Sequence, residues 1–353
     1  MDYPSNTYLE VQRLTNNDGS NNAYGRSLSS TINSRGDKLL VSGTKGYGSI
    51  SSNTPAVYVF TNVDYDIDKE ENDDGSIFSS SVHMTGGQIW TQLAKLQCPN
   101  ANILDQFGSS VDISETTIVV GASYTDNGVG AAYVYDTSVS SSSSSLFAWT
   151  QTAALSAHDG TISDFFGISV GVNGNYIFIG ASGQSSTGAV YVFKSSQVSG
   201  SSGSSSSSFR SWSQQAKLAS NVKGGFFGRS VAVSSAHIVV SSYGENQQAG
   251  SIYVYNNIGD SWTQTAKLTP PDLNFGDLFG FDVDVNNNHI LATSIYDNAK
   301  GHIINIINII IIIIIIIVVI IFIVIIIIII YIRSILWISL YFFIFTTIKD
   351  MGF

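Results

Sequence analysis

One short segment of the sequence has the spacing of a catalytic serine. Residues 167–171 read GISVG, the G-x-S-x-G pattern in which Ser169 would be the nucleophile of a hydrolase. That chemistry needs a sharp turn from a strand into a helix, which exposes the serine hydroxyl. The same aromatic-Gly-x-Ser pattern, however, also ends at Ser27, Ser110 and Ser230. We therefore interpret Ser169 as part of a repeated strand. Because no convergent acid, base or metal set accompanies it, we predict that the chain is not an enzyme.

A second segment has the spacing of a metal site. Residues 64–75 contain seven carboxylates, and Asp64, Asp66 and Asp68 follow one another at every second position. Calcium loops place their oxygen ligands at that spacing. The other interpretation is a solvated acidic insert, which we favour, so that no cofactor is expected unless Ca²⁺ binds here.

Composition excludes one class of partner. The 353 residues carry a formal net charge of −10, and no run of Lys and Arg interrupts them. Nucleic-acid binding depends on clustered positive charge, so we predict no nucleic-acid partner. A single cysteine, Cys98, excludes a framework of disulfides within the chain.

An aromatic-glycine pair recurs along the chain and marks a repeat. The pairs begin at Tyr24, Phe107, Phe166, Phe227 and Phe279. Each pair precedes two alternating or β-branched runs around a short polar turn, as in VAVSSAHIVVSS, which predicts a tight hairpin. A third apolar run such as GSIYVY and a fourth such as SWTQTAKL follow. Four short antiparallel strands in each unit of roughly 50 to 60 residues predict the blade of a β-propeller.

Tryptophan marks the fourth strand of the repeat. Four of the five tryptophans, Trp90, Trp149, Trp212 and Trp262, begin this segment. Since side chains alternate along a strand, we expect one packed face and one wet face. The packed face would hold Trp262, Gln264, Ala266 and Leu268, and the wet face Thr263, Thr265 and Lys267. In the first strand we expect Phe227 to pack against a neighbouring sheet and Gly228 to allow close backbone approach.

These segments resemble the FG-GAP repeat family, whose propeller repeats occur in integrin α chains. The resemblance rests on the FG pairs at Phe107, Phe166 and Phe227 and on the GAS segments at Gly121 and Gly180, and it covers roughly residues 8–302. It implies an all-β propeller with an adhesion or protein-interaction role. The calcium loops of integrin-type repeats lie between the first and second strands, with glycine after the third acid. Here Lys69 takes that place, and the acids lie between the third and fourth strands.

The repeat predicts four complete blades and a fifth shared by the two ends. The complete blades span residues 24–96, 107–155, 166–218 and 227–268. Residues 279–302 supply three strands of another blade, and residues 8–14, YLEVQRL, match the fourth strand. Closure by that strand would cover exposed sheet edges. Because integrin-type relatives have seven blades, the chain is alternatively a fragment of a larger propeller.

Residues 303–353 form an isoleucine-rich tail. From Ile309 to Ile332 the chain has 24 consecutive apolar residues. As a helix they would span about 36 Å, enough to cross a hydrocarbon core of about 30 Å. Arg333 and Lys349 follow, which favours a single-pass membrane protein with the propeller outside the cytoplasm. The alternative is translated AT-rich, low-complexity sequence, an artefact, since a soluble poly-isoleucine segment would aggregate.

We predict that ligands bind the face formed by the second-to-third loops and the loops that join successive blades, because loops on a rigid scaffold carry function. The candidate residues on this face are Tyr124, Asp126, Asn127, Gln184, Tyr243, Glu245, Asn246, Tyr296, Asp297 and Asn298. Aromatic rings beside amides and acids suit a protein surface or a sugar. The sequence therefore predicts a non-catalytic interaction or adhesion-like module, with a glycan-binding propeller as the alternative.

Overall fold

A computed structural model describes the fold for most of the repeat region. The described residues are 23–32, 36, 38–45, 55–64, 88–98, 103–137, 148–198, 209–258, 260–286, 289–296 and 301–305. The chain divides into two units, residues 1–287 with 291–302, and residues 288–290 with 303–353. Nearly all of the second unit lies outside the described residues.

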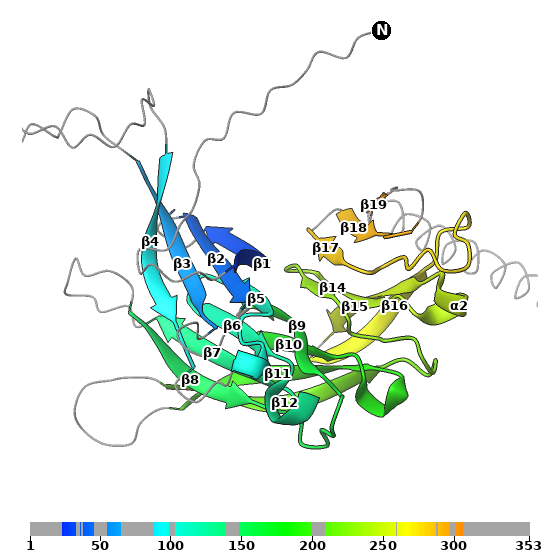
Figure 1. Cartoon of the computed structure of the whole chain (residues 1–353), viewed down its shortest axis with the longest axis horizontal. Helices are drawn as coiled ribbons and strands as arrows, with labels where there is room; N and C mark the ends of the chain where they lie inside the picture. Colours follow the sequence, from blue (N-terminus) through cyan, green and yellow to red (C-terminus); the bar gives the residue numbers. More distant parts are fainter. Residues whose placement is uncertain are drawn as a thin grey trace, which may run out of the picture. The chain divides into compact units, whose positions relative to one another are not determined.

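The described residues form antiparallel sheets that follow one another along the chain (Figure 1). We call the sheets blades 1 to 5. Blade 1 consists of β1 (Ala23–Ile32), β2 (Lys38–Lys45), β3 (Val57–Asp64) and β4 (Gln88–Leu96). Blade 2 consists of β5 (Ser110–Ile113), β6 (Thr117–Ala122), β7 (Ala131–Thr137) and β8 (Trp149–Leu155). Blade 3 consists of β9 (Phe166–Asn173), β10 (Tyr176–Ala181), β11 (Ala189–Val198) and β12 (Phe209–Ala219).

Blades 4 and 5 continue the same order. Blade 4 consists of β13 (Val231–Val233), β14 (His237–Ser242), β15 (Ser251–Ile258) and β16 (Ser261–Leu268). Blade 5 has three strands, β17 (Val283–Val285), β18 (His289–Thr293) and β19 (Gly301–Asn305). The prediction of an all-β chain built from four-stranded antiparallel sheets is confirmed for blades 1 to 4. Residues 8–14, the expected fourth strand of blade 5, lie outside the described residues.

The core consists of side chains packed between successive blades. One buried cluster joins Val119 and Val134 of blade 2 to Phe166, Ile177 and Ile179 of blade 3, and similar clusters join blade 1 to blade 2 and blade 3 to blade 4. The tryptophans of the fourth strands, β4, β8, β12 and β16, also contribute, and we call these the outer strands. The ring of Trp262 in β16, for example, meets Phe178 of blade 3 edge to face, with the ring centroids 5.0 Å apart. Each blade therefore depends on its neighbour for burial.

The outer strands differ from the predicted alternation because each contains a β-bulge. In β16, Ala266 pairs with Val254 while Gln264 pairs with Tyr255, so that Thr265 is the extra residue. The same register shift occurs in β4, β8 and β12. Because neighbouring residues of β15 point to opposite faces, the prediction that Trp262 and Gln264 share a face with Ala266 and Leu268 is wrong.

The aromatic-glycine pairs join each blade to the one before it. Phe107, Phe166, Phe227 and Phe279 are fully buried. The backbone of Phe227 also forms an isolated bridge with Gly188 of blade 3. A Cβ atom on Gly228 would approach the carbonyl oxygen of Ala189 in blade 3 too closely. The expected packing of Phe227 and the close approach at Gly228 are thus confirmed, and the glycine is needed for steric reasons.

Within the described parts of the chain, no helix is long and apolar enough to cross a membrane. The run from Ile309 to Ile332 lies outside those parts. Its interpretation therefore stays a prediction.

Candidate functional site

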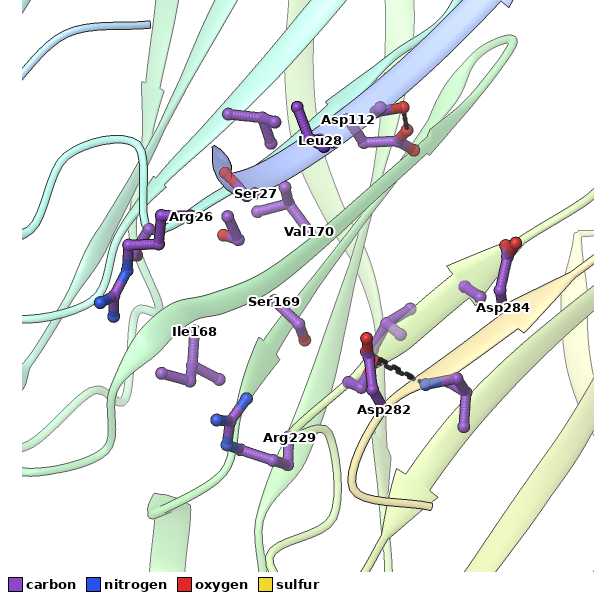
Figure 2. A pocket seen from close by; sticks show the side chains of 18 of the residues that line it. Arg26, Ser27, Leu28, Asp112, Ile168, Ser169, Val170, Arg229, Asp282 and Asp284 are labelled. Atoms are coloured by element: carbon purple, nitrogen blue, oxygen red, sulfur yellow. Dashed lines mark hydrogen bonds between the residues drawn. The ribbon is translucent and has the colours of Figure 1, made fainter. Parts of the chain in front are cut away.

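A cavity of about 1090 Å³ lies between the first strands of the blades. Residues of the first strands β1, β5, β9, β13 and β17, with Thr293 of β18, line it, and Figure 2 shows side chains from this lining. The chain enters each first strand from the loop that joins it to the preceding blade. The aromatic residue of each aromatic-Gly-x-Ser segment therefore lies toward the loop face that the sequence predicts. Cavities of this size are large enough to take a small molecule or a short segment of another chain.

Serine hydroxyls near the start of the first strands connect neighbouring blades. Ser27, Ser110 and Ser169 each donate a hydrogen bond of 2.9 Å to the carbonyl oxygen of the next FG glycine. Ser230 donates instead to Asp282 Oδ1 at 2.7 Å. Ser169 lies within strand β9 and is buried. The structure thus gives Ser169 the structural position that the repeat predicts.

Asp112 holds three blades together through one carboxylate. Its Oδ1 accepts a hydrogen bond of 2.5 Å from Ser29 Oγ in β1 and one of 2.9 Å from its neighbour Ile113 N. Its Oδ2 accepts a hydrogen bond of 2.7 Å from Val172 N in β9. Burial raises the pKa of Asp112 from 3.8 to about 6, although these hydrogen bonds oppose the shift. The charge of Asp284 across the cavity contributes a smaller part of this increase in the pKa of Asp112.

Two arginines line the same cavity at the end nearer the loop face. Arg26 and Arg229 occupy the same place in the repeat, directly before Ser27 and Ser230. Arg26 Nη2 donates to Gln106 Oε1 at 3.0 Å, and the guanidinium of Arg229 lies 5.0 Å from the ring centroid of Phe281. Burial lowers the pKa of Arg26, and the charge of Arg229 lowers it further. The two arginines therefore add positive charge to the same cavity. Sequence analysis did not single them out, although their shared place in the repeat was visible.

The second-to-third loops are built from left-handed turns. Asp126 and Asn127 have φ values of 51° and 60°, and Asn246 and Gln247 have φ values of 51° and 58°. Asparagine and aspartate tolerate this conformation better than most residues. Each turn ends at a glycine, Gly130 or Gly250, that bridges to the FG phenylalanine of the next blade. Asp126, Asn127 and Asn246 therefore have a conformational role in the turns.

Aligning the second-to-third loops of blades 2 and 4 by their turns shows which of their residues occupy equivalent places. The short helices α1 (Thr125–Gly128) and α2 (Glu245–Gln248) place Asp126 opposite Asn246 and Thr125 opposite Glu245. Tyr243 then corresponds to Ser123, and Tyr124 corresponds to Gly244. Tyr124 and Tyr243 thus project from different places in the repeat.

The predicted face contains exposed and buried members. Tyr124 is 44% exposed and Tyr296 is 70% exposed, and Asp126, Asn127 and Asn246 are also exposed. Tyr243 is half-buried, while Gln184 and Glu245 are buried, contrary to the expectation that they face solvent. Asp297 and Asn298 lie outside the described residues.

Glu245 is held inside blade 4 by four side chains. Lys267 Nζ lies 2.6 Å from Oε2, and Tyr253, Ser220 and Ser242 donate hydrogen bonds to Oε1. Burial by itself would raise the pKa of Glu245, but Lys267 and the hydroxyl donors outweigh it, so that the pKa is lowered. Glu245 is therefore a structural anion and offers no free acid to a ligand.

Aromatic rings gather at the loop face beside Arg229. Tyr243 stacks on Phe226 with the planes 5° apart and the centroids separated by 5.1 Å. Tyr243 also contacts Phe281, at 5.6 Å between centroids. On another loop, the rings of Tyr124 and Phe165 lie 5.2 Å apart. Tyr124 and Tyr243 are thus each part of an aromatic pair.

The predicted calcium ligands cannot be placed. Asp66 and Asp68 lie outside the described residues, and of Asp64 the backbone alone is described, at the end of β3. Among the residues that the structure describes, no group of three or more His, Cys, Asp or Glu side chains could hold a metal ion.

Comparison with known families identifies the repeat. The model for the FG-GAP repeat matches residues 90–135, 149–193, 212–255 and 262–303, which together cover half of the chain. Each matched segment begins at the tryptophan of an outer strand and ends in the third strand of the next blade. The family repeat therefore spans the junction between two blades.

Solved structures of similar shape are distant in sequence. The β-propeller domain of Cps50 (Swd1) from Myceliophteria thermophila is 10% identical, with a TM-score of 0.41 over 79% of this chain and 82% of that chain. Two structures of Sqt1 from Chaetomium thermophilum are 12% and 13% identical, with TM-scores of 0.36 and 0.33. They cover 71% and 72% of their own chains and 80% of this one. No curated protein matches the chain.

Proposed function

Because the chain belongs to the FG-GAP repeat family, we propose that it is a non-catalytic module that binds other proteins through the loop face. The loop face comprises the second-to-third loops and the loops that join blades. One observation carries the proposal. Of the eleven large apolar side chains that are exposed among the described residues, eight lie in these loops. They are Leu104, Tyr124, Ile162, Val222, Phe226, Phe275, Ile295 and Tyr296.

Exposed apolar side chains concentrated in the loops at one end of the blades favour a protein interface, because interaction sites expose more apolar surface than the rest of a soluble protein. Backbone hydrogen bonds keep these loops together. Phe165 N donates to Gly128 O at 2.8 Å, and Leu278 N donates to Gln248 O at 2.9 Å. Each bond joins a second-to-third loop to the loop that leads into the next blade. The face is thus preorganised, which lowers the entropic cost of binding.

The test compares two variants of the full chain as baits for cross-linked partners. Tyr124→Ala combined with Phe275→Ala removes two exposed rings from the loop face, and Phe275 is 76% exposed. Ile32→Ala is the matched control, because Ile32 is 62% exposed at the other end of β1. We expect a specific protein to be recovered by the wild type and the control and lost by the double variant. Equal recovery by all three would contradict the proposal.

Glycan binding is the second candidate, favoured by the exposed Tyr124 ring beside Phe165. Aromatic rings with a polar tip can support a sugar. A glycan array probed with the wild type, Tyr124→Ala and Tyr243→Ala separates the two functions. A glycan signal that both substitutions abolish supports a lectin, whereas no signal together with a recovered protein partner supports the interaction module.

We further propose two finer features that the sequence suggests. The first is that the chain is an adhesion-like ectodomain anchored to a membrane by its isoleucine-rich tail. The second is that residues 8–14 complete the fifth blade. Among the described residues, blade 5 has three strands and no fourth strand pairs with β19, which supports the second feature because an open sheet edge favours pairing. Sequencing the mature transcript across codons 295–353 tests the first, because an artefactual tail would be missing from it.

A further inference from the structure

Arg26 and Arg229 line the same cavity, and within the part of the chain that the structure describes neither has a carboxylate counter-ion. The polar contact of Arg26 is the neutral amide of Gln106, and that of Arg229 is the face of the Phe281 ring. The two arginines come from blades 1 and 4, so the fold brings them together.

Two of the three acids that line the cavity, Asp112 and Asp284, lie farther along their strands than the arginines, and all three acids already accept hydrogen bonds from other groups. Asp112 accepts hydrogen bonds from Ser29, Ile113 and Val172. Asp282 accepts from Ser230, and Asp284 accepts from Val285 N at 2.8 Å. Ser29, Asp112 and Asp284 come three residues after Arg26, Ser109 and Phe281 along their strands, which is a displacement of roughly 10 Å. Figure 2 shows Asp112 and Asp284 away from the labelled arginines, and Asp282 between Arg229 and Asp284.

Both guanidinium groups place a positive charge in the same cavity, so an anion bound there would be attracted by both. Guanidinium groups recognise carboxylates through two parallel hydrogen bonds. Tyr243 and Phe281 beside Arg229 supply an apolar wall, which strengthens the interaction by excluding water.

We propose that Arg26 and Arg229 bind a carboxylate of an acidic peptide segment from the protein partner. This inference rests on the proposed function, because the arginines line the cavity next to the loop face. The cavity of about 1090 Å³ has room for such a segment. The chain carries a net charge of −10, so specific attraction of an acidic partner needs a local cationic site such as this pair.

The experiment measures binding of fluorescein-labelled octaglutamate to the full chain by fluorescence anisotropy at low ionic strength, with octaglutamine as the uncharged probe. We expect Arg26→Gln and Arg229→Gln each to weaken octaglutamate binding by roughly tenfold. Arg26→Lys with Arg229→Lys should restore part of the loss, because lysine keeps the charge but lacks the fork. Arg210→Gln is the matched control. Arg210 lies on the outer strand β12, donates a hydrogen bond to Thr117 Oγ1 in β6, and does not line the cavity.

Three outcomes would overturn the inference. The first is unchanged octaglutamate binding by the double glutamine variant, or by the double lysine variant if the glutamine variant fails to fold. The second is equal binding of octaglutamine. The third is binding of inorganic phosphate at the arginines without competition from octaglutamate, which would make the ligand a small anion. If the double arginine variant still recovers the partner while Tyr124→Ala with Phe275→Ala does not, the proposed function stands and this inference falls.

Discussion

At the scale of single residues, Asp112 makes stability depend on pH. Its folded pKa of about 6 exceeds the ordinary value of 3.8, so the folded chain retains this proton more strongly than the unfolded chain does. The stabilisation is complete below pH 3.8 and is lost as the pH rises through about 6. The full loss amounts to about 3 kcal/mol, of which about 1 kcal/mol falls between pH 5 and pH 7.5.

Asp112→Asn removes this titration. In urea unfolding at pH 5 and pH 7.5, we expect the free energy of unfolding of the wild type to fall by about 1 kcal/mol relative to the variant. The difference between the two pH values is the quantity to compare, because the variant also loses an acceptor for backbone N–H groups. Parallel pH profiles would show that Asp112 keeps an ordinary pKa.

Glu245 should make the free energy of unfolding depend on pH in the opposite direction to Asp112. Its pKa is lowered, so its contribution is present above the ordinary pKa and is lost as the pH falls. Glu245→Gln leaves Lys267 without its carboxylate partner, and we expect a loss of about 2 kcal/mol at neutral pH. Glu115→Gln, on an exposed turn, is the control and should change stability little. Chemical denaturation of both variants checks this, and equal stabilities would refute the structural role of Glu245.

At the scale of elements, the glycine that ends each second-to-third loop fixes the spacing between blades. Gly188 has a φ of 88°, and a Cβ atom there would overlap the backbone of Phe227. Gly174 also has a positive φ of 56°, but it lies in a hairpin with nothing within 4 Å of the Cβ position. Substitutions at the two glycines therefore distinguish the cost of a left-handed backbone from the cost of a side chain between two blades.

We expect Gly174→Ala to destabilise the chain by about 1 kcal/mol, the cost of a left-handed alanine. Gly188→Ala should cost about 3 kcal/mol or more, because blades 3 and 4 must also move apart. Thermal and urea unfolding of the two variants measure the difference. Similar losses in both would mean that the junction between blades tolerates a side chain.

At the scale of the whole molecule, closure of blade 5 is the property to test. If residues 8–14 complete this blade, deleting residues 1–14 exposes an edge and apolar side chains, and the free energy of unfolding should fall by roughly 3 kcal/mol. Deleting residues 1–7 is the control and should leave stability unchanged. A chain that tolerates both deletions equally would contradict closure by this segment.

The sequence by itself determined the all-β repeat, because hydrophobic alternation, turn residues and the aromatic-glycine pairs are local signals that recur in every blade. It also indicated the structural roles of Ser169 and Gly228, since a residue found at one place in several repeats reflects the scaffold. The bulge at Thr265 was hidden, because strand alternation assumes that pairing is uninterrupted.

Only the tertiary structure decided what the side chains of different blades do together. Packing and register bring together residues that are far apart in sequence. Arg26 and Arg229 are one example, and Asp112 with Ser29 and Val172 is another. Burial also divided the predicted loop residues, exposing Tyr124 and enclosing Gln184 and Glu245. Pattern analysis cannot anticipate these results, because charge and exposure at a site depend on the neighbours that the folded chain brings there.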